Sequence, residues 1–219
     1  MLDDQNIKTQ FELESTDNCS ELLPHNDQLL RKEPVDLFSL AGIESNGVAK
    51  TFVFEADKIY GRLSMEVREV LEMPLFGWNN VLRDRDVFSE IFFRKNGVLC
   101  MNFDCDINGL YYNFDGKNIS RESVDVAVNN LLTVVSDMWN SGEMESFNIK
   151  TGDILFIKNL QCLHGRESLA SGDVGKRTLL RSYFCESVAK GLVEVAQGSP
   201  LGTEIREVSQ VVLTHGKSK

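Results

Sequence analysis

The most regular alternation of apolar and polar residues lies between Ser120 and Asn140. Apolar residues recur there every three or four positions, which places them on one face of an α-helix. The residues of this face are Val124, Val128, Leu131, Val135 and Met138. Ser120 precedes them and carries a hydroxyl group of the kind that favours a helix N-cap. The pattern predicts an amphipathic helix from Ser120 to about Asn140 that buries this face.

A second helical pattern runs from Ala56 to Glu72. Its apolar positions are again spaced for one helix face, and they are Ile59, Leu63, Val67, Val70 and Leu71. Met73 and Pro74 follow, and the helical conformation is disfavoured at a residue that precedes proline. We therefore predict one continuous helix that ends at Glu72.

Short apolar runs separated by turn-forming residues predict β-strands in the rest of the chain. These runs are Leu37–Leu40, Thr51–Phe54, Phe88–Phe93, Val98–Phe103, Ile154–Ile157 and Arg177–Phe184. A turn at Lys95-Asn96-Gly97 would join the third and fourth runs, and residues 104–117 are expected to form a loop. Taken alone, the pattern indicates a mixed, β-rich fold.

Length and composition are typical of one globular domain. The chain has 219 residues, which is enough for one sizeable core, and 42% of them are hydrophobic. We expect a single domain over residues 1–219, with a polar N-terminal segment at 1–21 and a C-terminal extension at 185–219.

The net charge of the chain limits the kinds of partner that can be expected. The net charge of −10 at pH 7 argues against nucleic acid or an anionic membrane surface as a partner. No apolar run reaches transmembrane length, and the N-terminus lacks a signal-peptide pattern. The five cysteines lack the C-x-x-C spacing of zinc sites. We expect reduced cysteines, a cytoplasmic location and a small-molecule partner, and the oligomeric state stays open.

Candidate chemistry comes from the positions of the three histidines, His25, His164 and His215. In an extended segment, residues i and i+2 lie on the same side, so His25 and Asp27 can bind one ion while Asn26 points away. His164 follows the predicted strand Ile154–Ile157, which would deliver it to a cavity mouth. Two imidazoles and one carboxylate can occupy one face of an octahedral metal and leave the opposite face to substrates.

Each part of this pattern has a less specific explanation. An H-x-D pair often occurs by chance, and a lone histidine is more often a hydrogen-bonded residue of the core. The metal hypothesis therefore depends on the joint pattern, which includes Arg177 and Arg181 on one face of the last predicted strand. His215 is expected to take no part in the site.

The loop that begins at Asp104 contains a second possible metal motif. Asp104, Asp106, Asn108 and Gly109 match the first positions of a calcium-binding loop. The twelfth position is Asp115, where that motif requires a bidentate glutamate, and no predicted helix follows directly. A polar turn between strands is the favoured interpretation.

Three stretches of the chain resemble the taurine dioxygenase and clavaminate synthase-like branch of the iron(II)- and 2-oxoglutarate-dependent dioxygenases. The similarity runs from about Leu23 to Phe184. The first stretch is Pro24-His25-Asn26-Asp27, and the second is Asn46 to Phe54, which contains a glycine and Thr51. The third stretch has three parts: Gly152 to Asn159, Leu163-His164-Gly165-Arg166, and Lys176 to Arg181. The first and third stretches together are the most specific part of the resemblance.

The resemblance implies roles for individual residues. His25, Asp27 and His164 would be the iron ligands and the catalytic centre. Thr51 and Arg177 would hold the distal carboxylate of 2-oxoglutarate, which a guanidinium suits because it forms bidentate, charge-assisted hydrogen bonds.

Arg181 resembles the arginine that meets an anionic group of the main substrate. The alternative is an ion pair, either at the surface or with a residue around the metal ligands. The implied fold is a double-stranded β-helix, or jelly roll, with flanking helices. The implied cofactor is Fe(II), with 2-oxoglutarate as cosubstrate and O2 as oxidant. The implied reaction oxidises an unactivated C–H bond of a small, anionic, amino-acid-like or natural-product compound by hydroxylation, desaturation or ring closure.

Two other classes of protein remain compatible with the sequence. A non-redox, cupin-like metal-binding protein could use the same ligands, but it would not need Thr51 and Arg177. A catalytically silent relative is the other alternative, because family members usually have many more residues before the H-x-D motif than precede His25 here.

Overall fold

The computed structural model describes residues 11–15, 20–27, 29, 35–79, 88–184, 204–208 and 211–215. Its helices are α1 (Ala56–Arg62), α2 (Met65–Leu71) and α3 (Arg121–Ser141), with short 3-10 turns η1 (Ile107–Gly109), η2 (Asn159–Gln161) and η3 (Ser171–Asp173). Strands make up most of the remaining regular structure, so the fold is mixed and β-rich, as the sequence pattern predicts.

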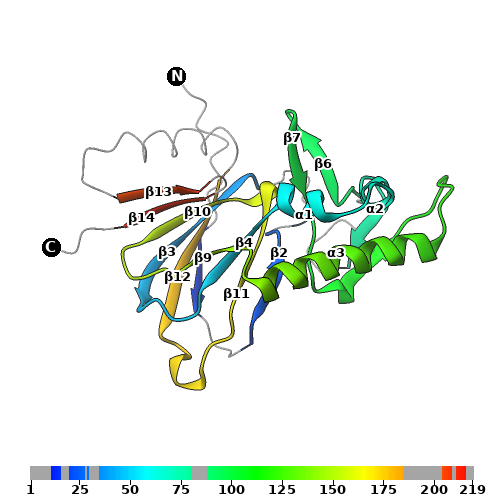
Figure 1. Ribbon diagram of the computed structural model, residues 1–219. Coiled ribbons are helices and arrows are strands. Elements are labelled where there is room, and N and C mark those ends of the chain that lie inside the picture. Colours follow the sequence, from blue (N-terminus) through cyan, green and yellow to red (C-terminus); the bar gives the residue numbers. More distant parts are fainter. Residues whose placement is uncertain are drawn as a thin grey trace.

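The larger sheet has six antiparallel strands in the order β1-β12-β3-β10-β14-β13 (Figure 1). The strands are β1 (Phe11–Ser15), β3 (Leu37–Ser45), β10 (Ile154–Lys158), β12 (Arg177–Phe184), β13 (Glu204–Val208) and β14 (Val211–His215). The N-terminal segment adds β1 to one edge beside β12, and the C-terminal extension adds β14 beside β10. Segments far apart in the sequence therefore form one sheet.

The smaller sheet has four antiparallel strands in the order β2-β11-β4-β9. They are β2 (Leu22–His25), β11 (Cys162–Arg166), β4 (Thr51–Glu55) and β9 (Glu145–Phe147). Two separate two-stranded sheets complete the set: β5 (Phe76–Trp78) with β8 (Leu110–Tyr112), and β6 (Phe92–Lys95) with β7 (Val98–Met101).

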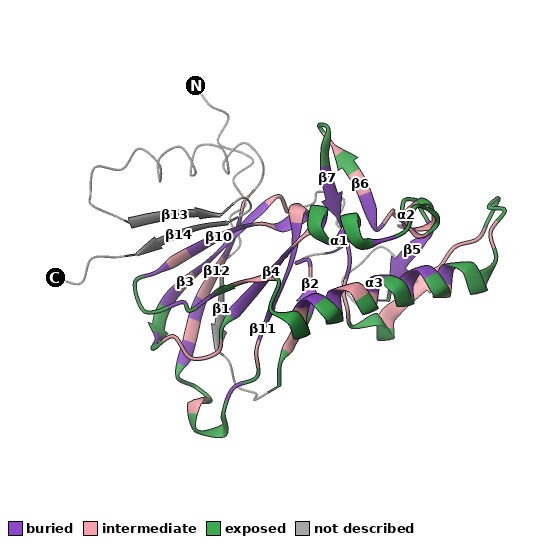
Figure 2. Ribbon diagram, viewed as in Figure 1, coloured by how far each residue is buried: buried purple, intermediate pink, exposed green. Residues whose placement is uncertain are grey.

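One hydrophobic cluster lies between the two main sheets. The larger sheet contributes Phe38, Leu40, Leu155, Ile157, Leu179 and Tyr183, and the smaller sheet contributes Val53, Phe147 and Cys162. Neighbouring residues of a strand point to opposite faces, so Phe52 and Phe54 belong to a second cluster on the other face of β4. The helices cover that second face, and α3 presents its buried side to it (Figure 2).

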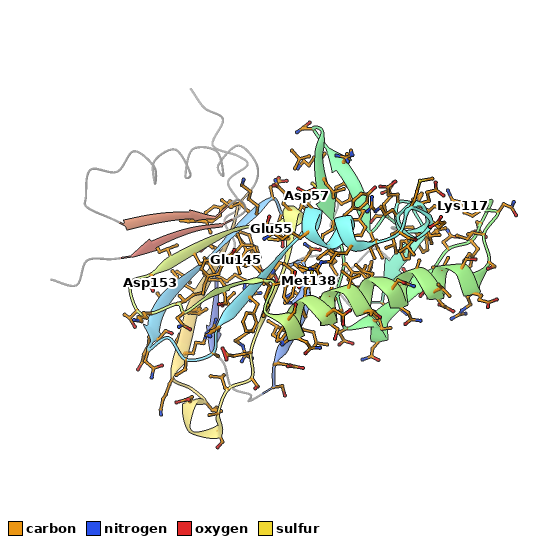
Figure 3. The ribbon with its side chains drawn as sticks, viewed as in Figure 1. Glu55, Asp57, Lys117, Met138, Glu145 and Asp153 are labelled. Atoms are coloured by element: carbon orange, nitrogen blue, oxygen red, sulfur yellow. The ribbon has the colours of Figure 1, made fainter. Side chains whose placement is uncertain are left out.

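Helix α3 confirms the predicted amphipathic pattern. All five residues of the predicted apolar face are buried, including Met138, which is labelled in Figure 3. Ser120 caps the helix by accepting a hydrogen bond from the Ser123 backbone N–H at 3.1 Å. The helix ends at Gly142, whose φ of 73° places it in the left-handed region that glycine favours.

The predicted continuous helix from Ala56 to Glu72 is wrong, because the chain breaks between α1 and α2. Leu63 adopts an extended conformation and becomes buried in the core. The hydroxyl group of Ser64 then accepts from the Val67 backbone N–H and caps α2. Placing Leu63 in the core and capping a new helix offset the intrahelical hydrogen bonds lost at the break.

The predicted strands are confirmed best where they are long. β12 spans Arg177–Phe184 as predicted, whereas the predicted strand Phe88–Phe93 is displaced, because β6 begins only at Phe92. The expected loop at 104–117 contains η1 and β8. β5 and β9 were not predicted, since strands of three residues are too short to produce a periodic pattern.

Among the helices in the described ranges, none combines the length and apolar character that crossing a lipid bilayer requires.

Candidate metal centre

The two predicted histidine ligands lie opposite each other in the smaller sheet. β2 and β11 pair in antiparallel fashion with His25 in register with His164. Paired residues of antiparallel strands have their Cβ atoms about 4.5–5.5 Å apart, so their side chains meet. The centroids of the two imidazole rings are 4.3 Å apart. Strand pairing therefore brings together two histidines from distant parts of the sequence.

Gly165, next to His164, allows β2 to approach β11 closely. A Cβ atom at this position would lie 2.7 Å from the Leu22 carbonyl oxygen and 3.3 Å from the Pro24 nitrogen. The register of the two strands also shifts between His164 and Arg166, which indicates a bulge. The close contact beside the bulge helps to place β2 against β11.

Asp27 follows β2 by two residues and completes a group of three possible metal ligands. Its Oδ1 lies 3.5 Å from His25 Nε2, and its Oδ2 lies 3.7 Å from His164 Nε2. The three ligand atoms lie within 4.8 Å of one another. Ligands at right angles on a metal with bonds of roughly 2.1 Å would be about 3.0 Å apart. A small inward movement of the three side chains is therefore enough to bind one ion.

The hydrogen bonds of the histidines leave suitable nitrogen atoms for a metal. His25 Nδ1 lies 2.8 Å from the Leu23 carbonyl oxygen, so Nδ1 carries the proton of the neutral ring and the lone pair is then on Nε2. Metal-binding histidines commonly donate their second N–H to a carbonyl in this way. Among the described residues, neither ring nitrogen of His164 has a hydrogen-bond partner, although the side chain is only 2% exposed.

Burial and neighbouring charges determine the protonation of His25, Asp27 and His164. Burial is the main reason that the pKa of His164 lies well below its ordinary value, and the neighbouring His25 adds to the shift. Burial opposes the charged forms of Asp27 and His25 as well, but neighbouring groups outweigh it. His164, His25 and Arg181 lower the pKa of Asp27, and Asp27 is the main reason that the pKa of His25 is raised. A neutral imidazole and an ionised carboxylate are the forms that bind metal ions.

Asp27 Oδ2 and both nitrogens of His164 are buried polar atoms without a hydrogen-bond partner among the described side chains. Such atoms are costly unless a partner compensates them. A divalent metal ion would compensate all of these except the second nitrogen of His164. The residues present thus fit a metal with two nitrogen ligands and one oxygen ligand, such as iron(II).

Thr51 and Arg177 meet across the space between the two main sheets. Arg177 lies on β12 of the larger sheet and donates from Nη2 to Thr51 Oγ1 on β4 at 3.1 Å. Both side chains are 2% exposed. A buried guanidinium beside a hydroxyl group can recognise a carboxylate.

Arg181 lies on the same face of β12 as Arg177, and it contacts the candidate metal ligands directly. Its Nη1 lies 3.0 Å from Asp27 Oδ1 and 3.4 Å from the Tyr183 hydroxyl group. Its guanidinium also lies 6.0 Å from the centre of the Phe38 ring. The acidic partner of Arg181 is thus the candidate metal ligand Asp27 and not a surface residue, which agrees with an ion pair around the metal ligands.

Asn159 is a residue of the site that the sequence pattern does not reveal. It ends the stretch Gly152 to Asn159 of the resemblance, yet it is fully buried and bonds to the backbone of Asp27. Asn26 was expected to point away from the metal, and its side chain does bond elsewhere, to the carbonyl group of Cys162. Hydrogen bonding to a distant backbone leaves no periodic pattern, although a polar residue directly after an apolar strand is a weak signal.

The remaining candidates are not members of this group of three ligands, although the backbone of Asp104 pairs with that of His25. In the loop at Asp104, the carboxylates accept backbone N–H groups of Asp106 and Asn108, as in a polar turn. Cys100, Cys105 and Cys162 are free, and burial raises the pKa of the Cys162 thiol. The other two cysteines, Cys19 and Cys185, and the side chain of His215 lie outside the described residues.

Comparison with solved structures shows the fold. The chain matches an asparagine oxygenase in complex with Fe(II), (2S,3S)-3-hydroxyasparagine and succinate, with a TM-score of 0.61, 14% identity, and coverage of 76% of this chain and 50% of the other. It matches the non-haem iron oxygenase OrfP in complex with Fe and α-ketoglutaric acid, with a TM-score of 0.60, 20% identity, and coverage of 80% and 53%.

A further structure of OrfP, in complex with Fe and L-canavanine, has a TM-score of 0.60, 19% identity, and coverage of 84% and 58%. The chain thus spans about half the length of the solved structures it matches. No family model matches the sequence, and no curated protein matches it either. At these identities the comparison establishes that the chain has the fold of non-haem iron oxygenases.

Proposed function

We propose that this chain forms the core of an iron(II)- and 2-oxoglutarate-dependent dioxygenase of the taurine dioxygenase and clavaminate synthase-like type. The observation that carries the proposal is the buried group of His25, Asp27 and His164. The hydrogen-bonded pair of Arg177 and Thr51 supports it, since this pair lies between the same two sheets. The fold shared with the asparagine oxygenase and OrfP adds independent support.

The two main sheets are assigned in this proposal to the two halves of a jelly roll. They are antiparallel and face each other across one hydrophobic cluster, and the metal ligands lie on β2, just after β2, and on β11. Ligands buried between two sheets suit oxidation chemistry, because burial keeps bulk water from the reacting groups.

His25, Asp27 and His164 would hold the metal on one side and leave the other side to ligands. Bound iron(II) would supply the coordination of 2-oxoglutarate and dioxygen and the oxidising power for a C–H bond. His25 is held in the correct tautomer by the Leu23 carbonyl group, so its Nε2 is ready to bind. Arg181 holds Oδ1 of Asp27 and leaves Oδ2 without a competing hydrogen bond among the described residues.

Arg177 and Thr51 would bind the distal carboxylate of 2-oxoglutarate. Arg177 is permanently charged and buried, so an anionic partner lowers its energy, and a carboxylate can accept two parallel hydrogen bonds from it. The hydroxyl group of Thr51 already orients Arg177 through their contact at 3.1 Å.

The substrate proposed is a small compound with an anionic group, most simply an amino acid. Arg181 would bind this group, since a guanidinium has five N–H donors and can contact both Asp27 and a second carboxylate. The neighbours support this choice, because their structures contain 3-hydroxyasparagine and L-canavanine.

The decisive experiment is an anaerobic titration of the protein with iron(II) and 2-oxoglutarate, followed by visible absorption. We expect a charge-transfer band that requires both components and is absent in a His164→Ala variant. A Lys117→Ala variant, changed in an exposed loop, should behave as the unaltered protein. Metal binding without a band would favour the non-redox, cupin-like alternative, and absence of metal binding would contradict the proposal.

A further inference from the structure

The middle residue of the H-x-D segment, Asn26, is buried and faces away from the metal ligands. It is 2% exposed. Its Nδ2 donates to the carbonyl groups of Asn159 and of Cys162, the latter at 2.9 Å. Its Oδ1 accepts the Phe103 backbone N–H at 2.8 Å, and its own backbone N–H donates to the Phe103 carbonyl group at 2.9 Å. Asn26 thus ties the segment to two other parts of the chain.

Asn159, the first residue of η2, holds the other side of the same segment. Its side chain is completely buried. Its Oδ1 accepts the Asp27 backbone N–H at 2.9 Å, and its Nδ2 donates to the Asp27 carbonyl group at 2.9 Å. The same Nδ2 donates to the Val35 carbonyl group at 3.0 Å. Both backbone polar groups of Asp27 are therefore fixed by one amide.

These contacts link the ligand segments to each other. Asn26 lies between His25 and Asp27, and its contact with the Cys162 carbonyl group reaches the strand that carries His164. Asn159 lies in the turn that leads directly into that strand. We call Asn26 and Asn159 the amide brace.

The chemistry of the brace requires amide side chains. Each of the two positions must donate to two carbonyl groups and accept one backbone N–H. An amide offers two donors and an acceptor, whereas a carboxylate offers no donor and an aliphatic side chain offers neither. An aspartate at Asn159 would place a negative charge against two carbonyl oxygens.

We infer that Asn26 and Asn159 are positioning residues, which set the geometry in which His25, Asp27 and His164 bind the metal. The inference rests on the proposed metal site and adds two residues to it. Neither amide touches the metal or the substrate; each acts by fixing the backbone that carries the ligands. Partners that orient metal ligands commonly change metal affinity by roughly 10- to 100-fold when they are removed.

The test measures cobalt(II) binding, since the visible d–d absorption of cobalt reports the geometry of its ligands. The variants are Asn159→Asp, which preserves shape, and Asn26→Ser. The control is Asn102→Asp, because Asn102 is also buried, at 8% exposed, but its Nδ2 bonds to Ser89 Oγ and not to the ligand segment. Folding of each variant is checked by circular dichroism before titration.

We expect Asn159→Asp to bind cobalt(II) at least tenfold more weakly than the unaltered protein, with altered d–d bands, and Asn102→Asp to keep its affinity within about threefold. A merely structural role would lower the unfolding temperature of all three variants and leave the affinity and bands of the folded proteins unchanged, which would overturn the inference. A tenfold loss in the Asn102 control would also overturn it. Should Asn159→Asp fail to fold, Asn26→Ser decides by the same criteria.

The metal site and the amide brace can be tested separately. If the unaltered protein binds no cobalt(II), both the metal site and the amide brace are wrong. If it binds cobalt(II) and the brace variants bind it equally well, the metal site stands and only the role of Asn26 and Asn159 is wrong.

Discussion

Asp27 is the residue on which the charges of the site converge. The nearest nitrogen atoms of His25, His164 and Arg181 lie 3.5, 3.7 and 3.0 Å from its carboxylate oxygens. The two histidines belong to the smaller sheet and Arg181 to the larger sheet. Their attraction outweighs burial and lowers the pKa of Asp27. The carboxylate is therefore ionised at neutral pH and ready to bind a cation without first losing a proton.

The proposed contact of Arg177 with 2-oxoglutarate gives a direct prediction. Arg177→Ala removes a charge-assisted contact worth about 1.5–3 kcal/mol, so 2-oxoglutarate should bind roughly 10- to 150-fold more weakly. Thr51→Ala should have a smaller effect in the same direction, because it removes a neutral partner. Affinity is measured from the charge-transfer band as 2-oxoglutarate is added. Arg94→Ala is the control, since Arg94 is an exposed arginine on β6; equal affinities in the Arg177 and Arg94 variants would contradict the assignment.

A second prediction concerns Arg181 and the substrate. Arg181→Leu should retain 2-oxoglutarate binding but lose the stimulation of succinate release by amino acids, because the substrate's anionic group has lost its partner. The measurement is succinate formation with and without a panel of amino acids. Arg121→Leu, changed at an exposed position of α3, should be stimulated normally. If Arg181→Leu is still stimulated, the arginine serves Asp27 alone.

Among the elements, the pair β2 and β11 matters most for the site, because it carries both histidines. The pair depends on a glycine at position 165, where a Cβ atom would lie 2.7 Å from the backbone of β2. No flexible side chain can relieve this contact, since the Leu22 atom involved is a carbonyl oxygen.

We therefore predict that Gly165→Ala forces β2 away from β11 and separates His25 from His164. Metal affinity should fall by tenfold or more, as it does when the groups that orient metal ligands are disturbed. The control is Gly172→Ala, because a Cβ atom at Gly172 meets nothing within 4 Å. Metal titration of the two folded variants compares them directly. Unchanged affinity in Gly165→Ala would show that β2 can move without loss of the ligand geometry.

For the whole molecule, the site joins the early part of the chain to its late part. The smaller sheet is built from strands that include residues 22–25 and residues 162–166, and the ligands come from both regions. An ion bound there stabilises the folded state, because the unfolded chain does not bring these residues together.

Iron(II) or cobalt(II) should accordingly raise the unfolding temperature. At a metal concentration 100 times the dissociation constant, the folded state gains about 2.7 kcal/mol. Anaerobic thermal unfolding, followed by circular dichroism with increasing metal, measures the shift. His164→Ala should show no such shift. An equal shift in that variant would place the bound metal elsewhere in the protein.

Local features of the structure were predictable from local sequence. The apolar face of α3, its cap at Ser120 and the full length of β12 follow from periodicity that spans many residues. The break between α1 and α2 did not follow, because Leu63 fits the apolar face of a continuous helix and is equally buried with an extended backbone. Strands of three residues, such as β5 and β9, are stabilised by their partners and have no pattern of their own.

The side chains that could form the site were recognisable in the sequence: an H-x-D pair whose spacing suits chelation, a later histidine, and two arginines on one strand face. Their contacts depend on the folded structure, in which His164 pairs with His25, Arg177 reaches Thr51 from the opposite sheet, and Arg181 holds Asp27. The role of Asn159 was recognised only from its hydrogen bond to Asp27 in the folded structure. The physical reason is that spacing along the chain sets which groups can face the same side of one element, whereas the distance between elements depends on strand register and packing between sheets.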